Sequence, residues 1–261
     1  MKEKVGPISL PDQFNAATYF IDRHQYEGRD ENIAIECRDT FLTYRSLRKD
    51  VSKFGDGLQK LGIKQGDRVL LLLLDTPEFA ISFFGSIKVG AVPVPINTFL
   101  PAIDYEYLLN DSEARVLIID SSLFSKIQSI KESLRFLEKI VVVGLENHQE
   151  INFENFIKNN SSELQSAPTH KNDVAFWLYS SGSTGRPKAC VHLQHDMVVC
   201  SERFAKGILN ITEEDRCFSV SKLFFAYGLG NALYYPFVVG ATSILMPELS
   251  KPISIAKIIN N

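Results

Sequence analysis

The spacing of apolar residues changes repeatedly along the first half of this 261-residue chain. In residues 47–61, apolar side chains recur every three or four positions, which places them on one face of a helix. In residues 69–74 the apolar side chains are continuous, which is typical of a strand covered on both faces. Because strands that alternate with helices form βαβ units, the pattern predicts a layered α/β domain with a mainly parallel sheet.

Residues with strong preferences at helix ends support these boundaries. Thr43 can cap the start of the first helix, and Gly62 can end it in the left-handed conformation. In the second helix, Thr76 suits the N-cap and Pro77 the first helical position, where its missing N–H costs nothing. Gly90 is then expected to close that helix.

The alternation continues beyond the second helix. Residues 91–96 are predicted to form a strand, which two prolines restrict to a sheet edge or a strand end. Further elements are expected as helices near 102–109 and 122–134 and as strands at 115–120, 139–144 and 241–246. The polar residues 149–173 predict a surface connection. We therefore expect a first α/β subdomain at approximately 1–190 and the start of an incomplete second α/β subdomain at 191–261.

Composition excludes several classes of protein. The net charge of −3 lacks the basic excess that nucleic-acid binding requires. The most apolar run has only six residues, and the N-terminus has no apolar signal core, so we expect a cytoplasmic protein without a membrane partner. The cysteines are scattered without a C-x-x-C pair, and they are expected to be reduced and mostly buried: Cys37, Cys190, Cys200 and Cys217.

A loop of small and hydroxylated residues separates two segments with the composition of strands, 174–179 and 188–193. Between them the chain reads Ser-Ser-Gly-Ser-Thr-Gly-Arg-Pro-Lys over residues 180–188. Gly182 and Gly185 permit a close approach of the backbone to a ligand, and successive N–H groups can form an anion-binding nest. The order of these residues favours a phosphate-binding loop over a flexible turn.

This loop differs from the two best-known nucleotide motifs. In a Walker loop the lysine directly follows the second glycine, whereas Lys188 lies three residues beyond Gly185 and follows Pro187. No predicted strand is followed by the G-x-G-x-x-G pattern of dinucleotide-binding folds.

Residues 179–188 resemble the signature loop of the acyl-adenylate-forming enzymes, which include acyl-CoA synthetases, luciferases and the adenylation domains of peptide synthetases. Residues 86–97 look like an earlier strand motif of that superfamily. Residues 221–231, Ser-Lys-Leu-Phe-Phe-Ala-Tyr-Gly-Leu-Gly-Asn, resemble its acyl-pocket segment in the form seen in benzoate–CoA and related aryl–CoA ligases. The resemblance covers the chain from about Asn15 to its end.

The family's chemistry has two steps. A carboxylate attacks the α-phosphate of ATP–Mg²⁺ to give an acyl-adenylate and pyrophosphate, and a thiol, usually CoA, then displaces AMP to form a thioester. The resemblance thus implies ATP, Mg²⁺, CoA and a small aromatic carboxylate as ligands. It assigns phosphate binding to Ser180, Ser181, Gly182, Ser183, Thr184, Gly185, Arg186, Pro187 and Lys188, with the Thr184 hydroxyl also near Mg²⁺.

The resemblance assigns part of the carboxylate pocket to Phe224, Phe225, Ala226, Tyr227 and Gly228. An aryl ring stacks well on aromatic walls, and the small alanine and glycine are expected to leave space for it. The alternative is that this apolar segment belongs to the core.

Three residues near the two motifs are harder to interpret from sequence. Lys222, next to the pocket segment, could attract a carboxylate or only be solvated. His192 and His195 are expected to be structural rather than ligand-binding.

Members of the family are about twice as long as this chain. The resemblance places the adenine and ribose segments, the hinge and the C-terminal domain with its adenylation lysine beyond Asn261. We therefore expect a truncated N-terminal AMP-binding domain, without catalytic residues of its own and inactive or nearly so by itself. The alternatives are adenylation of a fatty or amino acid, and a non-catalytic protein that binds nucleotide or acyl ligand. The sequence leaves the oligomeric state open.

Overall fold

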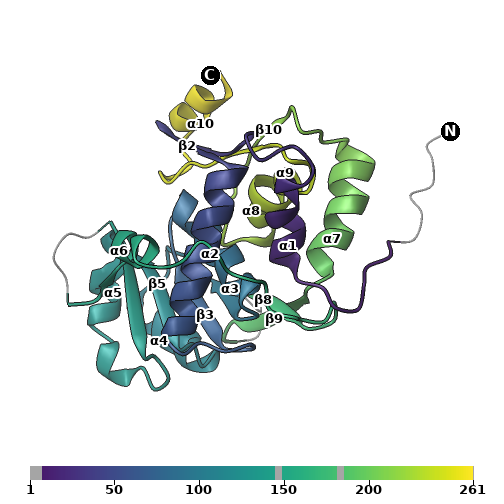
Figure 1. The fold of residues 1–261 in the computed structure, drawn as a ribbon. Helices are drawn as coiled ribbons and strands as arrows, with labels where there is room; N and C mark the ends of the chain where they lie inside the picture. Colours follow the sequence, from purple (N-terminus) through teal and green to yellow (C-terminus); the bar gives the residue numbers. More distant parts are fainter. Residues whose placement is uncertain (1–7, 145–148, 181–184, 261) are drawn as a thin grey trace.

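The structure is a computed structural model that describes residues 8–144, 149–180 and 185–260. It has the predicted layered α/β architecture, in which helices pack on a parallel five-stranded sheet and a four-stranded sheet lies at the other end of the molecule (Figure 1). The two sheets are joined by a large apolar core. The predicted fold class is confirmed.

The five-stranded sheet has the order β4-β3-β5-β6-β7, and all its neighbouring strands are parallel. Its strands are β3 (Arg68–Leu72), β4 (Val92–Pro95), β5 (Val116–Asp120), β6 (Lys139–Val143) and β7 (Ile151–Asn152). The proline-containing β4 lies at an edge, as predicted, because a proline cannot donate a ladder hydrogen bond. The expectation that 149–173 is a surface connection is corrected at two places. The short β7 joins the sheet, and the helix that follows it, residues 153–158, buries Phe153 and Phe156.

Alternate residues of the central strands face two different layers of helices. Val69 and Leu71 belong to the core cluster under α2 (Tyr44–Lys60), α3 (Pro77–Lys88) and α6 (Phe153–Lys158). Leu70 and Leu72 belong to the cluster under α4 (Ala102–Asp111) and α5 (Phe124–Gln128). This arrangement explains the continuous apolar run, because a strand covered on both faces has no solvent-facing positions.

The predicted ends of α2 and α3 are present, although the Thr76 side chain makes no capping hydrogen bond, and one predicted helix is shorter than expected. The Thr43 hydroxyl accepts a hydrogen bond from the Ser46 N–H at 3.2 Å, and Gly62 ends α2 with φ of +82°. The helix expected at 122–134 is instead the short α5 between two 3₁₀ turns, η2 (Ser121–Leu123) and η3 (Lys131–Ser133). There the Ser129 hydroxyl donates to the Lys126 carbonyl at 2.9 Å, a local bond that competes with helix continuation.

The four-stranded sheet has the order β10-β11-β1-β2. Its strands are β1 (Ile33–Cys37), β2 (Thr40–Thr43), β10 (Arg216–Phe218) and β11 (Thr242–Ile244). β1 is parallel to β11 and antiparallel to β2. One sheet thus combines strands from both sides of residue 190, the proposed boundary between the subdomains.

The remaining elements surround the second sheet and the strand pair that carries the loop. They are α1 (Ala16–Phe20), η1 (Asp22–Gln25), β8 (Val174–Ser180), β9 (Lys188–Leu193), α7 (Asp196–Cys200), η4 (Ser201–Leu209), α8 (Ala226–Leu229), η5 (Gly230–Tyr234), α9 (Tyr235–Val239) and α10 (Pro252–Ile259). Both predicted strands around the loop are confirmed as β8 and β9.

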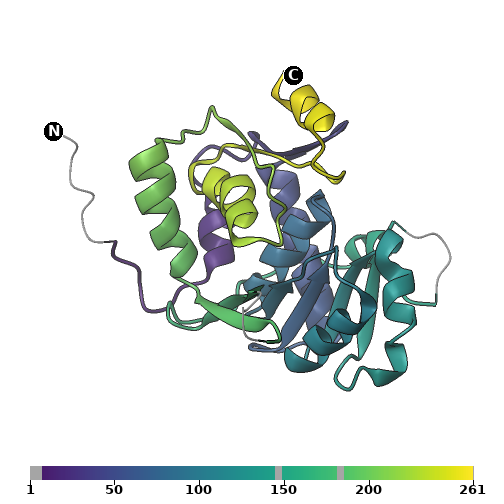
Figure 2. The same cartoon turned by 180° about the vertical axis from the view of Figure 1, so that it is seen from behind.

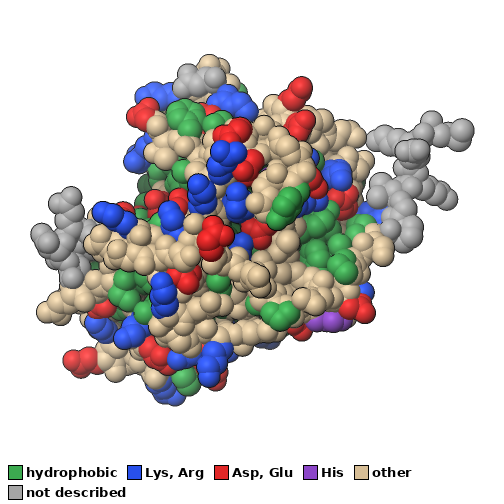
Figure 3. Space-filling model, in the orientation of Figure 1, with side chains coloured by type: hydrophobic (Ala, Val, Ile, Leu, Met, Phe, Trp, Pro, Cys, Tyr) green, Lys and Arg blue, Asp and Glu red, His purple; other side chains and the backbone are tan. Residues whose placement is uncertain are grey.

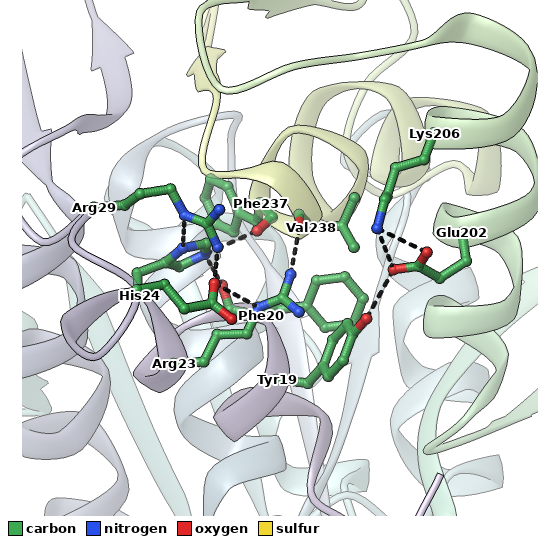
Figure 4. A network of polar contacts seen from close by, with 10 residues as sticks. Tyr19, Phe20, Arg23, His24, Arg29, Glu202, Lys206, Phe237 and Val238 are labelled. Carbon is green, nitrogen blue, oxygen red and sulfur yellow. Dashed lines mark hydrogen bonds and ion pairs between the residues drawn. The ribbon is translucent and has the colours of Figure 1, made fainter. Parts of the chain in front are cut away.

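A polar network joins the N-terminal helices to α9 (Figure 4). The fully buried His24 lies with Nε2 3.1 Å from the Phe20 carbonyl oxygen and 2.9 Å from that of Phe237. Arg29 donates from Nε to His24 Nδ1 at 3.0 Å, so the proton of the neutral ring is on Nε2 and points at the two carbonyls. The ring thus connects segments more than 200 positions apart in the sequence.

The surface carries charges of both signs. On the face seen in Figure 3, basic and acidic side chains are interspersed, in keeping with the net charge of −3. Within the described residues, no helix combines the length and apolarity needed to cross a bilayer.

Candidate active site

An antiparallel strand pair presents the predicted phosphate loop. Tyr179 pairs with Ala189 and Ser180 with Lys188, so the two ends of the loop are held in register. β8 lies next to β4, and β9 next to α7, which places the pair at the junction between the parallel sheet and the helices of the second half (Figure 2). Residues 181–184 of the predicted site lie outside the described residues.

The described end of the loop carries two exposed cations, Arg186 and Lys188. Among the described residues, neither has a carboxylate partner, and the Arg186 guanidinium lies over the Tyr107 ring at 4.9 Å from the centroid. Gly185 has φ of +150°, a conformation that favours glycine, with open space where a Cβ would be. Two uncompensated positive charges at the end of a small-residue loop are suited to an anionic ligand.

The predicted acyl-pocket segment forms a turn and the short helix α8. Phe224 is 6% exposed, whereas Phe225 and Tyr227 are 47% and 73% exposed and Ala226 is also at the surface. Phe224 contacts Phe225 at 4.5 Å between centroids and meets Phe99 edge-to-face at 5.7 Å. The three rings define the aromatic cluster Phe99–Phe224–Phe225.

Phe99 is a member of this cluster that sequence reasoning missed. It lies in the segment after β4 and is 56% exposed, and its N–H donates to Asn97 Oδ1 at 2.9 Å. A lone phenylalanine in a loop gives no periodic signal. Only the fold brings it to Phe224, 125 residues further along the chain.

Gly228 has a different role from the one expected. A Cβ built on it would lie 2.1 Å from the Lys222 carbonyl oxygen and 2.4 Å from that of Ser221. The space expected beside this residue is therefore filled by backbone. Glycine is needed here so that the turn can fold back closely onto α8.

Lys222 is neither solvated nor available to a substrate carboxylate. It is 8% exposed, its Nζ lies 3.6 Å from Asp75 Oδ2, and it donates to the Glu248 carbonyl at 2.6 Å. Asp75 also accepts from the Leu223 N–H at 3.1 Å. Burial raises the pKa of Asp75 to about 6, against the opposing effect of Lys222. The pair anchors the first residues of the aromatic turn to the segment between β3 and α3.

The two histidines after the loop have protein partners, in agreement with a structural role. His192 stacks on Phe176 with ring centroids 4.5 Å apart. His195 Nδ1 donates to the Lys171 carbonyl at 2.9 Å, and its Nε2 lies 3.2 Å from Asp196. No three His, Cys, Asp or Glu side chains in the described parts of the chain converge into a metal site. Thr184, the predicted neighbour of Mg²⁺, lies outside those parts.

The cysteines are free, as expected, but their burial differs from the prediction. Cys37 is buried, Cys200 and Cys217 are half-buried, and Cys190 is exposed on β9. None of the six positions of β9 is fully buried, so the strand offers Cys190 no core environment.

Comparisons with known proteins identify the family of the chain. The model of the AMP-binding family, described as AMP-binding enzyme, matches residues 22–261. A benzoate–CoA ligase of Thauera aromatica is 41% identical over 250 residues, which are 95% of this chain and 47% of that protein. A 4-hydroxybenzoate–CoA/benzoate–CoA ligase of Rhodopseudomonas palustris is 40% identical over 235 residues, 90% of this chain and 43% of that protein.

Solved structures of CoA ligases are also similar to this chain. An anthranilate–CoA ligase in complex with anthranoyl-AMP superimposes with a TM-score of 0.91 at 35% identity, over 95% of this chain and 48% of that one. A benzoate–CoA ligase from Burkholderia xenovorans gives a TM-score of 0.85 at 36% identity, over the same shares of the two chains. The chain spans about half the length of the curated relatives that it matches. By sequence and by fold, this chain belongs to the AMP-binding enzyme family.

Proposed function

We propose that this chain forms the N-terminal part of an ATP-dependent aryl–CoA ligase, which activates a benzoate-like acid as the acyl-adenylate and then transfers it to CoA. The observation that carries the proposal is the β8–β9 strand pair, which holds the two ends of a loop of Ser, Gly and Thr residues in register and places the exposed cations Arg186 and Lys188 at its C-terminal end. Its aromatic selectivity is supported by the Phe99–Phe224–Phe225 cluster and by the substrates in the names of the relatives.

The loop would act on ATP by position and charge. Lys188 and Arg186 would neutralise charge on the β- and γ-phosphates, which leave as pyrophosphate. The N–H groups of residues 180–185 would donate hydrogen bonds to the remaining phosphate oxygens. The residues fit a polyphosphate because the two cations are exposed and, in the described parts of the chain, lack carboxylate partners. Mg²⁺ would be bound mainly by phosphate oxygens, with the Thr184 hydroxyl as the protein ligand, and would neutralise charge on the leaving group.

The acid would lie with its ring against the aromatic cluster. Edge-to-face and stacked contacts favour a flat aryl ring over a flexible alkyl chain, which also loses rotational entropy when it binds. Gly228 and the buried Lys222–Asp75 pair would act indirectly, since they set the path of the turn that carries Phe224.

Carboxylate-dependent ATP–pyrophosphate exchange in the protein at its full natural length tests the proposal. We expect exchange with benzoate, and much less with hexanoate or alanine. Exchange only with the alkyl or amino acid would reassign the substrate class. Binding of ATP without exchange for any acid would favour the non-catalytic alternative.

Lys188→Ala tests the loop itself. Loss of one charge-assisted contact is expected to raise KM for ATP by about ten- to a hundredfold while leaving Tm unchanged, because the side chain is exposed. Lys158→Ala, an exposed lysine on α6, is the matched control. Unaltered ATP kinetics in Lys188→Ala would refute the assignment of the phosphate loop.

A further inference from the structure

We propose that Tyr107 and Asp111 of α4 are positioning residues that hold both ends of the loop between β8 and β9 in the geometry that binds ATP. The inference rests on the proposed function, because it concerns how the same loop is prepared for its ligand. It involves only described residues on either side of 181–184.

Asp111 holds the N-terminal end of the loop, where β8 leads into it. The Tyr179 hydroxyl, on the penultimate residue of β8, donates to Asp111 Oδ2 at 2.6 Å. Burial and this bond with Asp111 both raise the pKa of Tyr179, so its hydroxyl stays protonated and remains a donor at all physiological pH values. The contact joins two elements 68 positions apart at the point where the chain enters the loop.

Tyr107 holds the C-terminal end of the loop, where it leads into β9. Its hydroxyl lies 3.1 Å from the Pro187 carbonyl oxygen and 3.2 Å from Asp111 Oδ1, and its single proton can be donated to one of them at a time. The face of its ring lies under the Arg186 guanidinium at 4.9 Å, a cation–π contact. One helix thus contacts both ends of the same loop.

The position of Asp111 has no explanation in the stability of its own helix. It is the last residue of α4, where the helix dipole disfavours a negative charge, and the last turn contains no basic residue. The two tyrosine hydroxyls supply the compensating contacts. The contacts of Asp111 with Tyr107 and Tyr179 therefore explain why a carboxylate stands at this helix end.

α4 is a firm support for such contacts. Tyr105, Leu108 and Leu109 are fully buried under the sheet, and Arg68 of β3 donates from Nε to the Ser112 carbonyl at 2.6 Å, just beyond the helix end. The Arg68 guanidinium also lies 5.8 Å from the Trp177 ring of β8. The helix, the central sheet and the strand before the loop are therefore coupled.

Fixing both ends reduces the conformational entropy that is lost when phosphates bind to the loop. Release of one end is therefore expected to weaken ATP binding without altering any group that touches ATP. Arg186 would also lose its orientation if the Tyr107 ring were removed. The expected signature is a rise in KM for ATP with little change in kcat at saturation.

The test compares Tyr107→Phe and Asp111→Ala in the full-length protein, with Asp111→Asn as the conservative variant that keeps an acceptor oxygen. Tyr26→Phe, at a tyrosine that is 83% exposed, is the control. Two readouts are measured: the KM and kcat for ATP, and the rate of trypsin cleavage after Lys188 without ATP. Cleavage reports loop order independently of activity.

We expect Tyr107→Phe and Asp111→Ala to raise KM for ATP by about threefold to thirtyfold and to speed cleavage after Lys188, with partial recovery in Asp111→Asn. Unchanged cleavage would overturn the inference, as would faster cleavage with unchanged KM. Failure of the proposed function is recognised by a different result, an unaltered KM for ATP in Lys188→Ala. In that case the inference that Tyr107 and Asp111 prepare the loop for ATP is refuted as well.

Discussion

At the scale of single residues, the most informative group is the buried pair Lys222–Asp75. The lysine stands next to a predicted substrate pocket, and the sequence left open whether it attracts a carboxylate or is only solvated. Its 8% exposure and its bonds to backbone carbonyls give it a structural role instead. A local sequence cannot distinguish these roles, because the partner lies 147 residues earlier in the chain.

Lys222→Met is expected to destabilise the protein by about 3–5 kcal/mol at pH 8, since removal of one partner leaves a buried carboxylate unpaired. The loss should be smaller at pH 5, because the pKa of Asp75 is already raised to about 6 and protonation then removes the charge. Urea denaturation at the two pH values measures this difference. An equal loss at both would show that Asp75 is not charged in the folded protein.

His24 predicts an acid-sensitive contribution to stability. Burial, then Arg29, lower its pKa in the folded protein from 6.5 to about 4. Below pH 6.5 the unfolded chain therefore binds a proton that the folded chain does not, so stability falls as the pH drops toward 4, by up to about 3 kcal/mol. Asp75, with its raised pKa, acts with the opposite sign between pH 3.8 and about 6.

Urea denaturation at pH 7 and pH 4.5 in the unmodified protein and in His24→Gln isolates the histidine. Only the difference in pH dependence matters, since the substitution also changes stability at both pH values. We expect the variant to lose less stability on acidification. The same acid-induced loss in both proteins would mean that His24 is not the responsible group.

At the scale of elements, the turn before α8 depends on Gly228. Gly228→Ala places a Cβ 2.1 Å from the Lys222 carbonyl oxygen, closer than atoms can approach, so the backbone must move. The clash outweighs the better helix propensity of alanine, and a loss of about 1–3 kcal/mol is expected. Thermal unfolding measures it. Ala226→Gly, at the exposed start of the same helix, should lose less than 1 kcal/mol. A neutral Gly228→Ala would mean that the turn tolerates another path.

Most regular elements could be predicted because their signals are local. The period of residues 47–61, the cap at Thr43 and the apolar run at 69–74 each act within one element. The fragmented α5 could not be predicted, because serine hydroxyls there offer alternative bonds to the backbone. β1 and β11 are short, and their pairing depends on residues about 200 positions apart.

At the scale of the whole molecule, the two halves share one core. Ile35 of β1, Val69 of β3 and Phe237 of α9 belong to the same buried cluster. The Tyr44 hydroxyl also donates to the Ala241 carbonyl at 2.7 Å, from α2 to the residue before β11. Elements from the ends of the chain thus complete the packing of its middle.

This shared core predicts one cooperative unfolding transition for the chain. Trp177, its single tryptophan, lies in β8 and reports on the loop region by fluorescence, while far-UV circular dichroism reports on all helices. We expect the two signals to change together in urea. Two separated transitions would show that the proposed subdomains unfold independently.

The sequence by itself determined the fold class, the alternation of strands and helices around a mainly parallel sheet, and the three segments that resemble the family, because periodicity, caps and contiguous motifs are local properties. The tertiary structure decided the rest. It brought Phe99 to Phe224, paired Lys222 with Asp75, gave Gly228 its close backbone contacts and set Tyr107 and Asp111 against the ends of the loop. These contacts depend on which distant surfaces meet when apolar area is buried, and no local pattern encodes that outcome.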